Sequence, residues 1–183
     1  MFVALTGTPG TGKTAVAQVL KQKGYTIADL NDIAFSQHFI LGEDEERGSK
    51  ILDIASINSY LLKSFSDSEL VIIDGHASHH LSMVEKIIVL RCHPSTLQKR
   101  LGTKQWKEGK IAENVEAEAL DVILSEAADA FNEEDIYEID TTKQTIADVA
   151  AVVSDIIVSG FKPIKKYSIG LIDWSEDYFS TST

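Results

Sequence analysis

A glycine-rich segment near the N-terminus carries the residue types needed to bind a phosphate chain. Residues 7–14 read Gly-Thr-Pro-Gly-Thr-Gly-Lys-Thr, which fits the pattern G-x-x-x-x-G-K-[ST] between an apolar run and a helix-forming segment. Gly7, Gly10 and Gly12 let backbone N–H groups surround phosphate oxygens without a Cβ in the way, and the next helix directs its positive end at the same anion. The segment predicts a P-loop rather than an ordinary strand-to-helix turn.

Two residues of the segment and one distant acid have the chemistry for ATP and Mg²⁺. Lys13 is expected to reach the β and γ phosphates, and the hydroxyl of Thr14 to ligate Mg²⁺. Asp74 ends a buried β-branched run, where parallel sheets bind ligands, and could hold the Mg²⁺ shell opposite Thr14. The alternative for Asp74 is a turn residue that ends a strand.

Three histidines follow Asp74. Gly75 permits a tight turn, and His76 is expected to face the γ-phosphate region, where it could orient a water or a substrate hydroxyl; a structural hydrogen bond is the alternative. His79 and His80 complete a His-x-x-His-His pattern, for which a metal site is one interpretation. With no cysteine or carboxylate at matching spacing, we expect both on the surface of a loop.

Strands and helices are expected to alternate along the chain. The pattern predicts strands at 2–6, 25–30, 69–74, 86–91 and 135–140, helices at 12–23, 32–40, 57–65, 95–101, 111–131 and 145–158, and a mobile acidic loop at 41–50. Such βαβ units give a parallel sheet covered on both faces. The expected fold is an α/β P-loop NTPase three-layer sandwich with a five-stranded parallel sheet, in one domain spanning 1–183.

The net charge, the cysteine count and the lengths of the apolar runs limit which partners and which cellular location we expect. The net charge of −11 repels nucleic-acid phosphates and favours a basic protein partner over general nucleic-acid binding. The single cysteine, Cys92, excludes an internal disulfide and suits a reducing cytosol. No apolar run reaches the ~20 residues that cross a bilayer, and no signal peptide precedes the first strand. We therefore expect a cytoplasmic protein without membrane contact.

The last part of the chain differs in character. Residues 160–183 hold a lysine cluster and five aromatic residues, at positions 161, 167, 174, 178 and 179. An arm docked on the domain by its aromatic side chains is favoured over an arm that binds a partner.

Four segments together resemble the adenylate kinase isoenzyme 6 family, including its archaeal members. They are the P-loop, Ile-Ile-Asp-Gly-His at 72–76, Val-Leu-Arg-Cys-His-Pro at 89–94, and Lys-Ile-Ala-Glu-Asn-Val-Glu-Ala-Glu at 110–118. The likeness covers nearly the whole chain, and Ile-Asp-Trp-Ser-Glu at 172–176 is similar to archaeal tails.

The resemblance implies an ATP:AMP phosphotransferase with a nucleoside-monophosphate-binding region near 29–52 and a short lid near 103–113. It also implies ATPase activity and a role in maturing the small ribosomal subunit, through binding a ribosomal protein. Residues matching the family's ATP-phosphate contacts are Gly10, Gly12, Lys13, Thr14 and Ala15, and Lys104 falls where the family often has a lid arginine.

The chain departs from the family in its arginines, whose planar forks clamp phosphate oxygens. Phe35 replaces a frequent arginine of the monophosphate-binding helix. Arg47 is the best remaining clamp for the monophosphate, with a solvated loop charge as the alternative. Arg100 could face the phosphates or pair with a local acid.

The sequence leaves three functions open. The first is transfer of the ATP γ-phosphoryl to AMP or a related monophosphate. The second is an ATPase switch on a ribosomal protein with little true AMP kinase activity. The third is a small-metabolite kinase on the same fold.

Overall fold

Five parallel strands form one sheet in the computed structural model, which describes residues 1–44, 49–66 and 69–180. The order across the sheet is β2–β5–β1–β6–β7, so the P-loop strand lies at its centre. The strands are β1 (Phe2–Thr6), β2 (Thr26–Asp29), β5 (Val71–Asp74), β6 (Val84–Arg91) and β7 (Ile136–Asp140). The predicted parallel sheet is confirmed, including its five strands.

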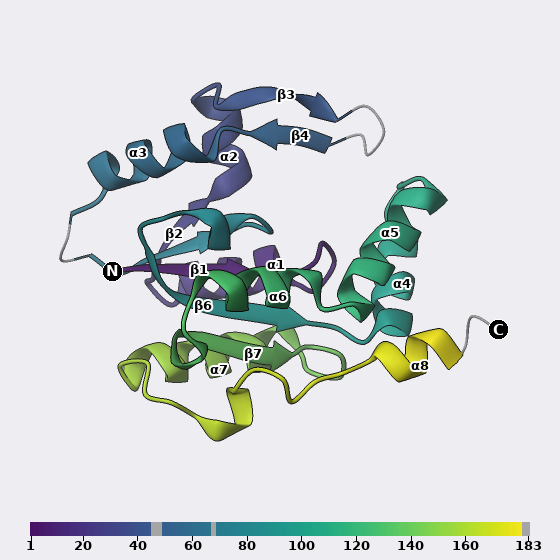
Figure 1. Ribbon diagram of the computed structural model, residues 1–183. Helices are drawn as coiled ribbons and strands as arrows, with labels where there is room; N and C mark the ends of the chain where they lie inside the picture. Colours follow the sequence, from purple (N-terminus) through teal and green to yellow (C-terminus); the bar gives the residue numbers. More distant parts are fainter. Residues whose placement is uncertain (45–48, 67–68, 181–183) are drawn as a thin grey trace.

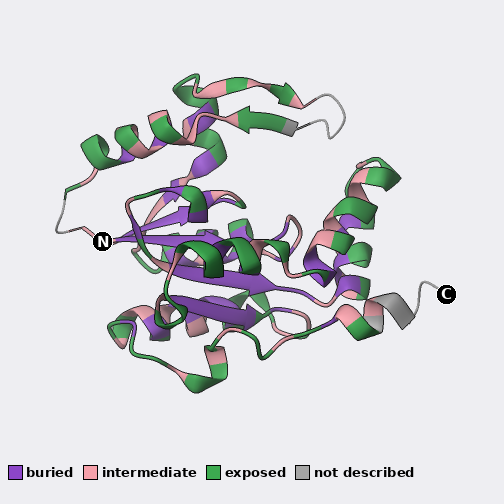
Figure 2. Ribbon diagram, viewed as in Figure 1, coloured by how far each residue is buried: buried purple, intermediate pink, exposed green. Residues whose placement is uncertain are grey.

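Alternate side chains of each central strand enter two separate cores. Val3 and Leu5 of β1 pack with α1 (Lys13–Gln22) and α7 (Ile146–Val158), on one face of the sheet. Phe2 and Ala4 point to the other face, which is covered by α2 (Leu30–Ser36), α3 (Ile54–Ser64) and α6 (Val122–Ala130). Figure 1 shows the resulting three layers, and Figure 2 shows the sheet buried between its helices. The three-layer sandwich is therefore confirmed.

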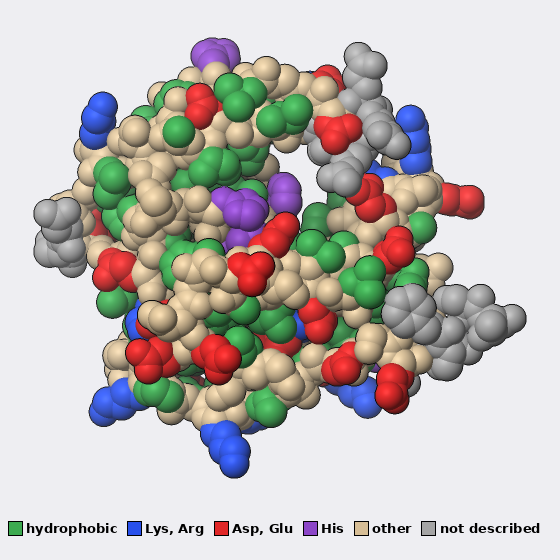
Figure 3. All heavy atoms as spheres, in the orientation of Figure 1, with side chains coloured by type: hydrophobic (Ala, Val, Ile, Leu, Met, Phe, Trp, Pro, Cys, Tyr) green, Lys and Arg blue, Asp and Glu red, His purple; other side chains and the backbone are tan. Residues whose placement is uncertain are grey.

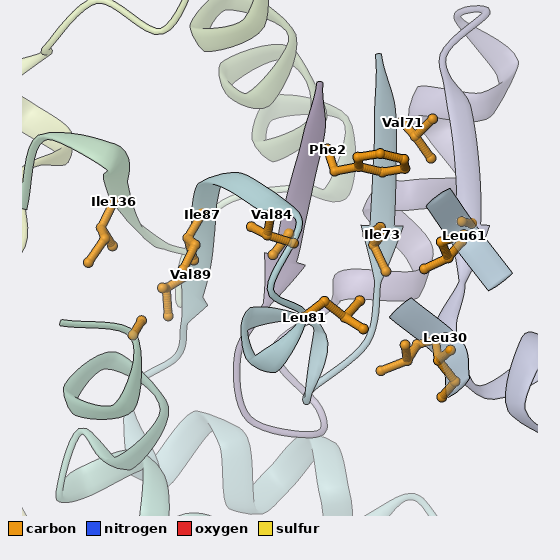
Figure 4. Close-up of a cluster of buried hydrophobic side chains, with 14 of the residues drawn as sticks. Phe2, Leu30, Leu61, Val71, Ile73, Leu81, Val84, Ile87, Val89 and Ile136 are labelled. Carbon is orange, nitrogen blue, oxygen red and sulfur yellow. The ribbon is translucent and has the colours of Figure 1, made fainter. Parts of the chain in front are cut away.

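The second of these cores lies behind the loop that follows β5. Figure 4 shows Phe2, Ile73 and Leu81 directed into one cluster with side chains from α2 and α3. Leu81 is fully buried and belongs to the segment between β5 and β6, which includes the 3-10 turn η1 (Ser78–His80). This packing fixes the loop after Asp74 against the body of the protein.

The acidic segment at 41–50 was expected to be a loop, and this prediction is wrong for its described residues. β3 (Ile40–Asp44) and β4 (Ser49–Leu52) form an antiparallel hairpin that Figure 1 shows above the main sheet. Ile40 and Leu52 pack against the second core, and Lys50 pairs with Glu43 at 2.6 Å. The sparse apolar residues suffice because only one face of the hairpin needs to be covered. Residues 45–48 lie outside the described residues.

The helix expected at 111–131 is in fact two helices, α5 (Glu108–Ala119) and α6. The chain turns at Asp121, whose φ of 55° is left-handed. Arg91 is the physical reason, because its guanidinium donates to the carbonyl of Glu118 and to the carboxylate of Asp121. Satisfying this buried cation ends one helix and redirects the chain into the next.

Other boundaries differ by a few residues. The helix expected at 32–40 ends at Ser36, before the left-handed His38, and the helix expected at 57–65 begins at Ile54, with Asp53 as its N-cap. The remaining elements are α4 (Pro94–Gly102), η2 (Glu133–Asp135), η3 (Lys165–Tyr167) and α8 (Ser175–Ser180). Among the described helices, none combines the length and apolar character needed to cross a membrane.

The segment after α7 returns along the body and ends beside α4, as Figure 1 shows in yellow. Phe161 is buried in the first core, with Tyr167 packed against it, and Tyr178 packs near α4 and α5. Trp174 is 9% exposed, with the guanidinium of Arg91 5.0 Å from its ring. Aromatic side chains therefore hold this segment to the domain, although it contains the short helices η3 and α8 rather than a fully extended chain.

Two glycines offer a test of how tightly the P-loop is packed. Gly7 has φ 132°, and a Cβ added there would lie 2.3 Å from the carbonyl oxygen of Leu90; Gly24 has φ 96° but no atom within 4 Å of its added Cβ. We expect Gly7→Ala to lower the free energy of unfolding by about 3 kcal/mol or more, because strain and backbone overlap add. Gly24→Ala should cost about 1 kcal/mol, from strain alone. Urea titrations measure both, and equal losses would contradict the close packing of Gly7 on β6.

Candidate functional site

The P-loop joins the end of β1 to the start of α1 and has a backbone shape that glycine permits. Gly10 and Gly12 have φ near 100°, and an added Cβ at Gly10 would lie 2.8 Å from the side chains of Leu97 and Leu101. Gly12 occupies the N-cap position of α1, so no side chain covers the first N–H groups of that helix. These groups can bind an anion.

Lys13 is the buried cation of the loop. Its Nζ donates to the carbonyl oxygens of Gly7 at 2.6 Å and Thr8 at 3.1 Å, so the ammonium lies within the curve of the loop. Burial lowers the pKa of Lys13 to about 8, against the attraction of Asp74 and Glu118. Because this ammonium is poorly solvated, an anion that binds beside it would stabilise its charged form.

Asp74 and Thr14 face each other across the end of β5 and the start of α1. Asp74 is 3% exposed, and Thr14 contributes a hydrogen bond that lowers the pKa of the carboxyl, although burial raises that pKa overall. The Oδ1 atom of Asp74 is buried without a hydrogen-bond partner among the described residues. A buried carboxylate oxygen with an unused lone pair, next to a threonine hydroxyl, fits the hard-oxygen donor set of Mg²⁺.

The predicted site residues meet around one cavity of about 740 Å³. Its lining includes Gly10, Gly12, Lys13, Thr14, Ala15, Asp74, His76, Arg100 and Lys104. Arg47, the expected monophosphate clamp, lies outside the described residues. Segments 10–15, 74–76 and 100–104 are thus brought together from three separate parts of the chain.

His76 lies at the exposed rim of this cavity. Desolvation by neighbouring groups lowers the pKa of His76, and the charge of Lys13 lowers it further. The imidazole is therefore neutral at pH 7 and can accept a proton or orient a water molecule.

Arg100 lines the cavity and also supports its wall. Its guanidinium donates to the carbonyl oxygen of Thr141 at 2.8 Å and of Thr142 at 3.4 Å, and to the hydroxyl of Thr141 at 3.2 Å. These partners differ from the local acid that was considered as an alternative. The arginine connects α4 to the loop after β7, and Thr141 in turn donates to the carbonyl of Thr11 in the P-loop.

Residues 104–110 cover one side of the cavity. The ammonium groups of Lys104 and Lys110 each lie 5.0 Å from the centroid of the Trp106 ring, which they share as a cation–π partner. All three side chains line the cavity. Two lysines of this wall are therefore held by one aromatic ring, and Glu113 of α5 lines the same cavity.

Glu118, to which the sequence alone assigned no role, holds the P-loop through a hydrogen bond from Thr8. Thr8 donates to Glu118 Oε2 at 2.5 Å, while Glu118 Oε1 accepts from Arg91 Nε at 2.9 Å and from the Cys92 N–H at 2.9 Å. Glu138 also accepts from Arg91, at 2.5 Å. Desolvation raises the pKa of Glu118, opposed by Arg91. Glu118 belongs to the 110–118 segment quoted above, but only the fold shows which side chain reaches the P-loop.

A second cavity, of about 390 Å³, lies between α1, β2, α2 and α3. Lys21, Asp29, Asp32 and Tyr60 are among its lining residues. It shares Thr14 and Asp74 with the larger cavity, so the two hollows meet beside the P-loop threonine.

The expectation that His79 and His80 both lie on the surface is wrong for His79. His79 is 2% exposed, and its ring hydrogen-bonds to Thr6 through Nδ1 at 3.0 Å. Its Nε2 lies 3.1 Å from Glu126 Oε2 on α6, a carboxylate that is far away in the sequence. His80 is exposed, as expected. Figure 3 shows histidine and acidic side chains gathered in the middle of one face, beside a hollow.

Comparisons with known proteins show the family to which the chain belongs. Residues 3–121 match the family described as "AAA domain". A protein of Archaeoglobus fulgidus is 42% identical over 95% of this chain and 92% of its own length, and one of Methanocaldococcus jannaschii is 34% identical over 100% and 98%. Both are named "Putative adenylate kinase".

Solved structures show the same fold in more distant proteins. Shikimate kinase from Acinetobacter baumannii superposes with a TM-score of 0.59 at 16% identity, over 87% of this chain and 93% of its own. Shikimate kinase from Bacteroides thetaiotaomicron gives 0.56 at 17% identity, over 86% and 98%. With its P-loop, its parallel sheet and its close relatives, the chain belongs to the archaeal family of P-loop kinases that carries the adenylate kinase name.

Proposed function

We propose that the protein transfers the γ-phosphoryl group of ATP to AMP, giving two ADP, and also hydrolyses ATP. The relatives' name and the P-loop kinase fold support a nucleotide kinase. The observation that carries the finer proposal is the meeting of two cavities at Thr14 and Asp74. Phosphoryl transfer needs a donor and an acceptor on opposite sides of the transferring group. Two cavities that meet at Thr14 and Asp74 could hold the donor and the acceptor in this way.

The larger cavity is assigned to ATP. Lys13 and the N–H groups of residues 10–15 bind its β and γ phosphates, and Thr14 and Asp74 hold Mg²⁺. When bound, the ion neutralises charge on the phosphate oxygens. Lys13 stabilises the charge that develops on the transferring group, because its ammonium is fixed in position and shielded from water.

The smaller cavity is assigned to the acceptor monophosphate, in the region 29–52. Its described lining includes Asp29 and Asp32, which suit the amino groups of a base better than a phosphate. The phosphate end of the acceptor is therefore placed toward Thr14, with Arg47 as its proposed clamp. Lys104 and Arg100 complete the ATP side, and residues 103–113 form the lid that excludes water.

We further propose a role in the maturation of the small ribosomal subunit, with a basic ribosomal protein as partner in the cytoplasm. Support comes from the resemblance to the adenylate kinase isoenzyme 6 family and from the net charge of −11, which attracts basic partners. His76 would orient the water that is needed when hydrolysis replaces transfer.

Nucleotide binding should depend on the protonation of Lys13. The pKa of Lys13 is lowered to about 8, so its ammonium is present below that pH and is lost as the pH rises through it. We expect ATP affinity to fall several-fold between pH 8 and 9.5, because the free protein loses the ammonium from about pH 8 upward while the bound phosphates keep Lys13 charged to higher pH. Lys13→Arg keeps its charge at every pH tested and should remove this decrease. Calorimetric titrations at each pH measure it, and parallel curves for both proteins would exclude Lys13 as the cause.

The kinase reaction should require Lys13 and AMP together. We expect AMP to stimulate ADP formation strongly in the wild-type protein, and Lys13→Ala to lower the rate about 100-fold or more, because one buried electrostatic contact to the transition state is lost. Lys162→Ala removes an exposed lysine after α7 and should leave the rate unchanged. A coupled ADP assay with Mg²⁺ gives these rates.

The same assay, run beside a measurement of phosphate release, separates the alternatives. If AMP gives no stimulation while a basic small-subunit ribosomal protein increases phosphate release, the protein is an ATPase switch. If a non-nucleotide alcohol alone stimulates ADP formation, the protein is a small-metabolite kinase. An unaltered rate in Lys13→Ala would refute the assignment of the P-loop as the ATP site.

A further inference from the structure

We propose that His79, His80 and Glu126 form a binding site for a Zn²⁺-type transition-metal ion, separate from the Mg²⁺ position at Thr14 and Asp74. His79 and His80 end the turn η1 after β5, and Glu126 comes from α6. Each residue offers one ligand atom, and the three atoms lie within 4.8 Å of one another. This inference does not depend on the proposed kinase activity.

The distances between the ligand atoms already approach those of a coordinated ion. Glu126 Oε2 lies 3.1 Å from His79 Nε2 and 3.9 Å from His80 Nε2. Zinc binds imidazole nitrogen and carboxylate oxygen at about 2.0–2.2 Å, so tetrahedral geometry separates its ligands by about 3.3 Å. The ligand atoms of His79 and His80 lie within 4.8 Å of each other, so a movement of the exposed His80 side chain by up to about 1.5 Å would complete the triangle. Two imidazole nitrogens and one carboxylate oxygen suit Zn²⁺ better than Mg²⁺, because Mg²⁺ prefers oxygen ligands alone.

The hydroxyl of Thr6 can hold His79 in the tautomer that a metal ligand needs. Its oxygen lies 3.1 Å from the carbonyl oxygen of His76 and 3.0 Å from Nδ1 of His79. With the hydroxyl proton donated to that carbonyl, the hydroxyl oxygen accepts from Nδ1–H, which leaves Nε2 of His79 with a lone pair for the ion.

In that tautomer, Nε2 of His79 and Oε2 of Glu126 are two acceptors 3.1 Å apart, and an ion between them would be bound by both. A ligand histidine commonly has its Nδ1–H held by a hydrogen bond in this way.

The surroundings leave room for entry and for a further ligand. The side chains of His80 and Glu126 are 48% and 46% exposed, whereas that of His79 is 1% exposed. Three protein ligands around zinc leave a position for water. The ion would join α6 to the loop that begins at Asp74, and would therefore hold His76 at the rim of the cavity.

Zinc binding to the metal-free full-length protein tests the site, with excess Mg²⁺ present to occupy oxygen-only sites. Competition with a chromophoric chelator gives the affinity, and Co²⁺ spectra report tetrahedral coordination. We expect one saturable zinc per chain and at least tenfold weaker binding in His80→Ala and in Glu126→Gln. Both variants change exposed side chains and should fold, which His79→Ala need not do.

Two controls match the charges and residue types. Asp129→Asn removes an exposed acid from the same helix, and His38→Asn removes an exposed histidine at a left-handed position that asparagine tolerates. Neither should change zinc affinity. Equal binding in the ligand variants and the controls, or no saturable binding by the wild type, would overturn the proposal. So would ¹⁵N spectra that show the proton of His79 on Nε2 in the presence of zinc.

Discussion

The carboxylate of Glu118 in α5 accepts hydrogen bonds from two other segments, the P-loop and the end of β6. Thr8 belongs to the P-loop, Arg91 ends β6, and the Cys92 N–H follows that strand. A carboxylate that is 2% exposed is stable only when it is paired and fully hydrogen-bonded, and Arg91 supplies the opposite charge. Losing Arg91 would leave a buried charge uncompensated, and losing either of the other donors would leave a buried oxygen short of a hydrogen bond. The P-loop, the end of β6 and α5 therefore keep one relative position.

This pairing also connects α5 to the P-loop. Glu118 stands near the end of α5, the helix whose first turn carries Lys110 at the wall of the larger cavity. The same arginine that pairs with Glu118 also donates to the carbonyl of Glu118 near the end of α5, and it contacts the Trp174 ring of the C-terminal segment. Trp174 of the C-terminal segment therefore covers Arg91, which pairs with Glu118, and Glu118 in turn accepts a hydrogen bond from Thr8 of the P-loop. Docking of the C-terminal segment thus helps to hold the P-loop in position.

The sequence predicted the sheet because buried parallel strands are unbroken apolar runs, and Ile72, Ile73 and Asp74 illustrate the pattern and its end. It placed Lys13, Thr14, Asp74 and His76 around one point because the carboxyl ends of parallel strands share an edge.

The features that it missed are set by contacts between distant residues. Glu126 meets His79 only because α6 crosses the face of the sheet, and α5 and α6 separate only because Arg91 needs the Asp121 carboxylate. The hairpin at 40–52 was missed for a related reason, since its strands are polar and pack on one side alone. Spacing along the chain carries no signal for such contacts.

Two opposite charges in the site are each less stable than they would be in water. Burial lowers the pKa of Lys13 and raises that of Asp74, so the protein disfavours both charged forms, and their mutual attraction compensates only in part. A polyphosphate placed against Lys13 and a divalent cation placed against Asp74 would each supply the missing partner. Because a ligand carrying both charges relieves both costs at once, binding of nucleotide and binding of Mg²⁺ should favour each other. The same low solvation then strengthens the electrostatic contacts to the transferring phosphoryl group, because no water competes for them.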